Sequence, residues 1–300
     1  MIICPFCQKE ALFHFYSRDY NRRISREIFS HYRCSSCGLI FIAQIPDNLS
    51  DYYPASYYAG PLSQEQLATM AKHERYKIDI IQKFVTGGRL LEIGPAYGCF
   101  AWLAKQAGFE VEAIEMDSSC CQFLTDVVGI RAINNSNTCV ALKDLEPYHV
   151  IALWHVIEHL PDPWKTLEAI SEKLLPGGIL TIATPNPDSF QARIFGKYWH
   201  HLDAPRHLML IPAPLIIKKM ESLGFKIAMH TTADKGSLGC NRSGWVYFFS
   251  NMCLLRFMKL AARLIGWIVS MLMNPIENVE GKGCAYTLVF LKEALKEKTE

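Results

Sequence analysis

Two histidines and one glutamate lie close together in the stretch HVIEHLPDP, directly after an apolar segment that ends at Trp154. His155, Glu158 and His159 are spaced so that a helical turn would place their side chains on one face. A histidine that titrates near neutrality and is oriented by a carboxylate can remove a proton from a bound hydroxyl group. The spacing therefore predicts a general base. In a second interpretation, Glu158 and His159 only cap and brace a local helix.

Four cysteines in two Cys-x-x-Cys pairs occupy the start of the chain. Cys4 and Cys7 form the first pair, and Cys34 and Cys37 form the second. Thiolates in this arrangement are a closed tetrahedral set for a structural zinc ion, with no coordination position left for a substrate. The alternative is four unrelated buried thiols. We expect a zinc ribbon over residues 1–48, whose small core needs the metal for its folding energy.

The stretch LLEIGPAYGCF, residues 90–100, runs from a short apolar strand through a turn into a helix. Such turns present backbone N–H groups to the polar end of a ligand. Glu92 lies at the end of the first strand and Glu115 at the end of the second, about twenty residues later, where a ribose diol needs an acceptor. The pattern predicts a nucleoside-like ligand at this turn.

These groups need a rigid frame, and the periodicity of the chain predicts one. Strand-like apolar segments alternate with helical segments, which indicates a parallel sheet with helices on both faces. A helix over residues 67–84 is expected to lead into the first strand. The strands are expected at residues 90–93, 110–115, 130–133, 148–153, 179–184, 225–231 and 286–292. The predicted fold class is α/β, with a doubly wound, mostly parallel sheet.

On these residues the sequence resembles the class I S-adenosylmethionine-dependent methyltransferases. In that family an acidic-x-Gly-x-Gly-x-Gly turn holds the methionine part of the cofactor. Glu92, Gly94 and Gly98 match this turn, and Ala96 stands at its middle glycine. The resemblance implies a Rossmann-like sheet of seven strands with the last one antiparallel. We expect a less permissive backbone at Ala96, which Pro95 stiffens further.

The resemblance also implies S-adenosylmethionine as the cofactor and assigns its contacts. In that family the acid after the second strand binds the ribose hydroxyls, and the turn that corresponds to residues 134–137 contacts the adenine. A nicotinamide cofactor is disfavoured, because it needs a third glycine inside the helix, where this chain has Cys99 and Phe100. The implied cofactor contacts are Glu92, Gly94, Pro95, Ala96, Gly98, Glu115, Met116, Ser136, Trp154 and His155.

The histidine segment resembles most closely the quinone-ring O-methyltransferases. In those enzymes the matching positions are Glu, Glu and His and bind a divalent metal. Here they are His155, Glu158 and His159. His155 replaces a carboxylate and weakens the preference for a hard metal. General base, metal ligands and helix bracing therefore remain three alternatives.

A later segment, DAPRHLML, lies over the active site in the family that this chain resembles. Arg206 carries a planar, permanently charged group that suits a carboxylate or phosphate of the acceptor. In the alternative, Arg206 pairs with Glu158 or Asp203 and holds the loop in place. His207 is a second candidate acid or base.

Residues 49–66 are expected to link the ribbon to the catalytic domain, which is expected over residues 67–235 and 283–300. The linker is rich in tyrosine. These rings either fold over the cofactor cleft as a lid and acceptor platform, or pack the ribbon against the catalytic domain. They are Tyr52, Tyr53, Tyr57 and Tyr58.

An apolar helical insertion, residues 236–282, is expected before the last strand. Within residues 244–275 no uncharged run reaches the ~20 residues that cross a bilayer. Arg256, Lys259 and Arg263 form one basic stripe on this helix. The helix either lies on a membrane surface with its cations at the headgroups, or packs on the catalytic domain or a twin subunit in a homodimer.

The composition limits the classes of function. The chain has 300 residues, a net charge of +2, and half of its residues are hydrophobic, which is typical of a globular protein. The small net charge argues against a nucleic-acid substrate. Eleven cysteines, an odd number, and no recognisable signal at the start favour a reducing, cytoplasmic location. Contact with the inner membrane face is expected if the insertion meets lipid.

These features favour methyl transfer from S-adenosylmethionine to an oxygen or carbon of a small acceptor. A ribbon ahead of such a domain resembles sugar C-methyltransferases, so a cell-surface sugar or sugar-nucleotide is the first expectation. A quinone or phenol ring is the second, and an RNA base the third. The non-enzyme alternative is a zinc-ribbon binding module with a degenerate cleft. Two departures from the family keep it open: Ala96, and His149, where relatives usually have aspartate.

Overall fold

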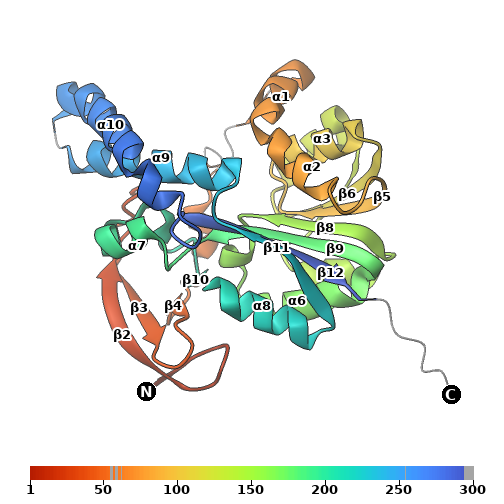
Figure 1. Ribbon diagram of the computed structural model, residues 1–300, viewed down its shortest axis with the longest axis horizontal. Coiled ribbons are helices and arrows are strands. Elements are labelled where there is room, and N and C mark those ends of the chain that lie inside the picture. Colours follow the sequence, from red (N-terminus) through yellow and green to blue (C-terminus); the bar gives the residue numbers. More distant parts are fainter. Residues whose placement is uncertain (55–56, 58–59, 62, 254, 294–300) are drawn as a thin grey trace.

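The computed structural model describes residues 1–54, 57, 60–61, 63–253 and 255–293 (Figure 1). At its centre lies a seven-stranded sheet of order β11-β12-β9-β8-β5-β6-β7. Its strands are β5 (Gly88–Ile93), β6 (Phe109–Glu115), β7 (Arg131–Asn134), β8 (Tyr148–Trp154), β9 (Leu174–Pro185), β11 (Phe225–Thr231) and β12 (Ala285–Lys292). Strand β12 runs antiparallel to both of its neighbours, β11 and β9, and the other neighbouring pairs of this sheet are parallel. The predicted fold class, strand positions and reversed last strand are confirmed.

Helices cover both faces of this sheet, and two apolar clusters fill the space between. One face carries α1 (Gln64–Ala71), α2 (Arg75–Ile81) and α3 (Cys99–Gln106). The other carries α5 (Thr138–Lys143), α6 (Pro163–Lys173) and α8 (Ala213–Ser222), while α4 (Ser118–Phe123) follows β6. The central strands are buried on both faces, which explains their near-continuous apolar runs. The single helix expected over residues 67–84 is instead two helices separated by the 3-10 turn Lys72–Glu74.

A second sheet contains the two Cys-x-x-Cys pairs. Its order is β1-β2-β3-β4-β10, with β1 (Ile2–Ile3), β2 (Glu10–Ser17), β3 (Phe29–Cys34), β4 (Ile40–Ile42) and β10 (Met209–Leu210). Strand β10 comes from the chain beyond β9, and pairs Met209 with Phe41 and Leu210 with Ile40. The ribbon sheet is therefore completed by a strand that lies far outside residues 1–48.

The ribbon also shares its core with the larger sheet. Cys4, Leu39 and Phe41 belong to the same apolar cluster as the buried side chains of α6 and α8. The Phe6 and Trp164 rings lie 4.5 Å apart. Burial against the catalytic part therefore also stabilises this segment, beside the folding energy expected from the metal.

The apolar insertion forms a helical hairpin that projects from the body of the molecule (Figure 1). It consists of α9 (Lys235–Met252), the 3-10 turn Arg256–Met258 and α10 (Lys259–Glu277). Helix α9 packs beside α7 (Phe190–Phe195), where the Phe195 and Phe248 rings stack at 4.2 Å. Among the described residues, no helix has both the length and the apolar character that a bilayer span requires.

Candidate functional site

A cavity of about 630 Å³ opens at the carboxyl ends of β5, β6 and β8. Open α/β sheets bind ligands at this edge, and the volume is typical of small-molecule sites. Every residue that the resemblance assigned to the cofactor lines this cavity. They are Glu92, Gly94, Pro95, Ala96, Gly98, Glu115, Met116, Ser136, Trp154 and His155.

The turn after β5 brings the backbone against the cavity. Gly94, Ala96 and Gly98 all have positive φ, at 68°, 50° and 75°. A Cβ at Gly94 would lie 2.6 Å from Val156 Cγ2, so a side chain is excluded there. Ala96 takes the left-handed conformation of the glycine that it replaces. This conformation costs an alanine about 1–2 kcal/mol more than a glycine, in keeping with the less permissive backbone expected at Ala96.

Glu115 holds this turn from the end of β6. Its Oε2 accepts a hydrogen bond from Ala96 N at 2.9 Å, and its Oε1 accepts one from Asp117 N at 2.9 Å. The residue is 3% exposed, and burial raises its pKa against the opposing effect of these backbone donors. Each carboxylate oxygen keeps a second lone pair, so Glu115 can accept further hydrogen bonds from a diol in the cavity.

Glu92 is a buried carboxylate at the opposite side of the turn. Its Oε2 has no hydrogen-bond partner within the described part of the chain. Burial raises the pKa of Glu92 to about 8, although Lys77 lowers it in part. A buried acceptor without a donor is costly. A cationic ligand group, such as the ammonium of the methionine part of S-adenosylmethionine, would supply the missing donor.

Lys77 and Glu74 also line the cavity, although the sequence analysis did not identify them. Lys77 Nζ donates to Glu74 Oε2 at 2.7 Å and lies 5.1 Å from the centre of the Trp154 ring. The sequence signal that could have identified Lys77 is its place among the isoleucines of RYKIDII, since a lysine is rarely buried in a helix without a partner. This pair places a positive charge close to Glu92.

His155 is the first residue beyond β8 and has a strained backbone. Its φ is +58°, which is uncommon for a residue other than glycine and is concentrated at functional sites. Its N–H donates to Ala183 O at 2.8 Å. Its Nδ1 lies 3.6 Å from Glu158 Oε1, and about a third of the side chain is exposed. The ring therefore faces the cavity with a carboxylate behind it.

Glu158 is fully buried in the 3-10 turn Ile157–His159. Its Oε2 accepts from Thr184 Oγ1 at 2.8 Å, while its Oε1 has no hydrogen-bond partner among the residues that the structure describes. Burial would raise the pKa of Glu158, but the neighbouring imidazoles, beginning with His155, keep it below its ordinary value. Glu158 therefore stays ionised and can orient a histidine.

His159 and His207 lie together on the other side of Glu158. Their rings meet edge to face at 4.6 Å. His159 Nδ1 lies 3.0 Å from both Tyr53 Oη and Arg206 O, and burial lowers the pKa of His159 to about 4. Glu158, His159 and His207 have ligand atoms within 4.8 Å of one another. The three residues close enough to bind one metal ion are therefore Glu158, His159 and His207, whereas the sequence predicted His155 as the third ligand.

Arg206 does not face the cavity, and its expected contact with an acceptor needs correction. The side chain is fully buried and makes paired hydrogen bonds to Asp203, at 2.9 and 2.7 Å. Its second partner is Asp19 of the ribbon, at 2.7 Å, and not Glu158. Both carboxylates raise the pKa of Arg206 against the effect of burial. The alternative in which Arg206 holds the loop is the one that the structure shows.

The linker tyrosines divide between the two expected roles. Tyr53 and Tyr57 line the cavity. Tyr52 is buried against Phe29 of the ribbon, and its Oη lies 2.8 Å from Ser25 Oγ. Tyr58 lies outside the described residues. The segment therefore contributes both to the cavity wall and to the packing of the ribbon.

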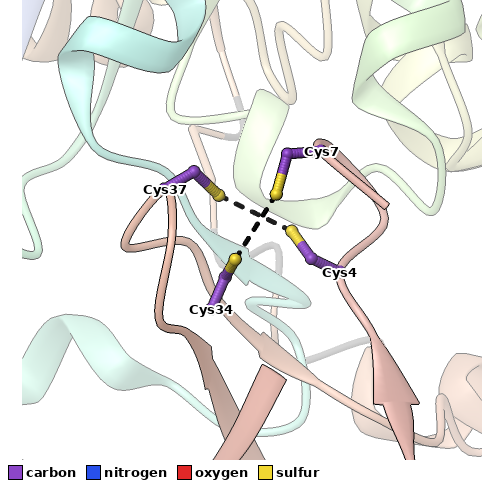
Figure 2. Close-up of side chains that lie close together, drawn as sticks. All are labelled: Cys4, Cys7, Cys34 and Cys37. Atoms are coloured by element: carbon purple, nitrogen blue, oxygen red, sulfur yellow. Dashed lines mark hydrogen bonds between the residues drawn. The ribbon is translucent and has the colours of Figure 1, made fainter. Parts of the chain in front are cut away.

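The four ribbon cysteines point toward a common centre (Figure 2). Cys4 Sγ lies 3.6 Å from Cys37 Sγ, and Cys7 Sγ lies 3.4 Å from Cys34 Sγ. Sulfurs at about 2.3 Å from a tetrahedral zinc lie at nearly these separations. Burial would raise the pKa of the Cys34 thiol, but the backbone N–H groups of Cys37 and Ser36 lower it to about 7. The set fits zinc in ligand type, number and spacing.

Comparison with known proteins supports the assignment of the larger domain. Residues 67–230 match the family model described as a methyltransferase domain. The ubiquinone biosynthesis O-methyltransferase of Cereibacter sphaeroides is 31% identical over 119 residues, which are 38% of this chain and 48% of that protein. Its Xylella fastidiosa counterpart is 29% identical over 118 residues, 37% of this chain and 48% of that protein. The chain thus spans about half the length of the curated relatives it matches.

Solved structures show the same fold at low sequence identity. An S-adenosylmethionine-dependent methyltransferase from Archaeoglobus fulgidus gives a TM-score of 0.52 at 18% identity, covering 77% of this chain and 95% of that one. The phosphoethanolamine N-methyltransferase 2 of Haemonchus contortus, in complex with S-adenosylmethionine, gives 0.52 at 13% identity, covering 85% and 62%. These likenesses concern the fold alone.

Proposed function

This chain belongs to the methyltransferase domain family and has its class I fold, and from that premise we propose that it transfers a methyl group from S-adenosylmethionine to an oxygen of a small acceptor. The observation that carries the proposal is the pair of buried carboxylates around one positive-φ turn. Glu115 is rigidly held with free lone pairs, and Glu92 has an orphaned oxygen. The two supply acceptors for a ribose diol and for an ammonium group.

For the acceptor we favour a phenolic or quinone-derived ring. The named relatives are ubiquinone biosynthesis O-methyltransferases, and the cavity is lined by the aromatic side chains of Tyr53, Tyr57 and Trp154. The cell-surface sugar that we expected first gains no support from these relatives. An aromatic acceptor would stack on such a wall.

The reaction needs alignment and the removal of one proton. S-adenosylmethionine supplies a methyl group on a sulfonium, which is already activated for transfer. The turn at residues 94–98 and Glu115 hold the donor in place, and the aromatic wall orients the acceptor. His155, oriented by Glu158, takes the proton from the acceptor hydroxyl. His159, which is neutral, and His207 brace the turn behind it.

Replacing Glu115 with alanine is expected to weaken S-adenosylmethionine binding by about 100-fold. The change removes a charged acceptor for the ribose, worth about 1.5–3 kcal/mol, and it releases the Ala96 N–H that Glu115 holds in the turn. Isothermal titration calorimetry measures the loss. Glu110→Ala, an exposed position at the other end of the same strand, is the matched control. If the native chain shows no heat of binding, the enzyme proposal fails and a binding module remains.

We also propose that Cys4, Cys7, Cys34 and Cys37 bind one structural zinc. Metal analysis of the purified protein is expected to give one zinc per chain. Cys37→Ser should remove it and lower Tm, by about 2–4 °C for each kcal/mol lost. Cys253→Ser is the control, because Cys253 lies outside the cluster. Full zinc content in Cys37→Ser would contradict the site.

A further inference from the structure

Helix α10 has its small residues toward the protein and its large apolar residues toward solvent. Ala262, Gly266 and Ser270 are buried, and a Cβ at Gly266 would lie 2.6 Å from Val246 Cα of α9. The two helix backbones are therefore in close contact. A surface helix of a globular protein normally shows the reverse arrangement. The solvent-facing side of α10 is therefore largely apolar.

The exposed apolar residues form one continuous arc, which we call the apolar arc. Phe257 is 81% exposed, Leu260 78%, Leu264 57%, Met271 57% and Leu272 66%, and Trp267 and Ile268 are 45% exposed each. Spacings of three and four residues keep these side chains on one side of the helix. Monomeric soluble proteins rarely expose contiguous apolar patches of this kind without a partner.

The charge of the hairpin is one-sided. No aspartate or glutamate lies between Asp234 and Glu277. Since the whole chain has a net charge of only +2, the remainder of the molecule is net negative. Lys259 and Arg263 are exposed and lie along the edge of the apolar arc. The cationic residues of this stretch are Lys235, Arg242, Arg256, Lys259 and Arg263.

The base of the hairpin is anchored to the body by a buried network. Glu277 Oε1 accepts hydrogen bonds from Trp245 Nε1 at 3.0 Å and from Gln191 Nε2 at 2.7 Å. Gln191 Nε2 also donates to Asn241 O at 2.7 Å. The arc therefore projects from the molecule on a fixed support (Figure 1) and does not need to fold back onto the catalytic domain.

We propose that the α9–α10 hairpin docks the protein on an anionic lipid surface, with the apolar arc in the acyl boundary and its cations at the headgroups. This inference is independent of the proposed methyl transfer. An amphipathic helix with cations on its flank has this binding mode. A second copy is a poorer occupant, since a two-fold interface through this hairpin would bring together two surfaces of like positive charge.

Vesicle flotation of the full-length protein tests this docking. The protein is expected to float with vesicles of equimolar phosphatidylglycerol and phosphatidylcholine, and much less with phosphatidylcholine alone. Leu264→Glu should reduce partitioning about tenfold or more. Leu12→Glu on β2, at the same 57% exposure, should leave it unchanged. Replacing Lys259 and Arg263 by glutamine should reduce it about fivefold for each cation.

Three results would overturn the proposal. The protein fails to float with the anionic vesicles, or Leu12→Glu and Leu264→Glu lose binding equally. The third is a lipid-independent dimer in sedimentation velocity that Leu264→Glu converts to a monomer with no change in vesicle binding. That result would assign the arc to self-association. Because flotation needs neither cofactor nor acceptor, a failure of methyl transfer leaves this test unaffected.

Discussion

Replacing His155 by asparagine is expected to lower kcat by about 10²–10⁴-fold, the range for loss of a positioned general base. Asparagine tolerates the positive φ of this position, so the backbone at the end of β8 should be retained. The affinity for S-adenosylmethionine should change little, because asparagine keeps the positive-φ backbone of this position in the cavity wall. Methyl transfer to a phenolic acceptor under saturating conditions measures the effect.

The split between kcat and cofactor affinity separates a base from a structural residue at position 155. His155→Asn should lower kcat while S-adenosylmethionine still binds. Glu158→Gln should lower kcat as well, because Glu158 Oε1 lies 3.6 Å from His155 Nδ1 and orients the ring. His230→Asn, on the exposed side of β11, is the control. An unchanged kcat in His155→Asn would remove the general base from the mechanism.

Replacing Asp19 by alanine is expected to lower the free energy of unfolding by about 3–5 kcal/mol, the cost of leaving a buried charge with a missing partner. Asp19 and Arg206 are both fully buried at the contact, and the pair joins the ribbon to the loop after β9. Urea unfolding followed by circular dichroism measures the change. Asp47→Ala, an exposed ribbon position, should shift the midpoint little.

The acid dependence of stability should change in the same variant. Hydrogen bonds and the charge of Arg206 hold the pKa of Asp19 below its ordinary value despite burial. A carboxylate with a lowered folded-state pKa contributes stability above its unfolded pKa and loses it as the pH falls through the folded value. The native protein should therefore lose more stability in acid than Asp19→Ala. Equal stability of both proteins at neutral pH would contradict the role of this pair.

Features with a local pattern were predictable from the sequence. The strands of the central sheet appear as short apolar runs, and the turn at residues 94–98 carries its glycines at fixed offsets. The cavity lining followed from these two patterns, because carboxyl ends of parallel strands meet at one edge. Ala96 shows the limit of this reasoning. The turn imposes a left-handed backbone on a residue whose type argues against it.

Features that depend on distant contacts were not predictable. The partnership of Arg206 with Asp19 joins residues 187 positions apart, and nothing near either residue indicates it. His207 joins Glu158 and His159 in the group whose ligand atoms lie within 4.8 Å of one another, since the loop after β9 brings it there through tertiary packing. The orientation of α10, with its small residues inward, depends on its contact with α9 and could not be read from α10 alone. The basic stripe by itself did not decide whether the helix meets a membrane, the catalytic domain or a twin subunit.

The pairing of β4 with β10 limits the order in which the chain can fold during synthesis. The ribbon is synthesised before β10, so Phe41 has no partner strand on this side until Met209 has been made. Until then, an apolar edge with free backbone groups is a template for unwanted pairing. Early capture of zinc by the cysteines would hold the nascent ribbon in shape over this interval. The bound metal would then protect the free edge of β4 from mispairing until β10 has been made.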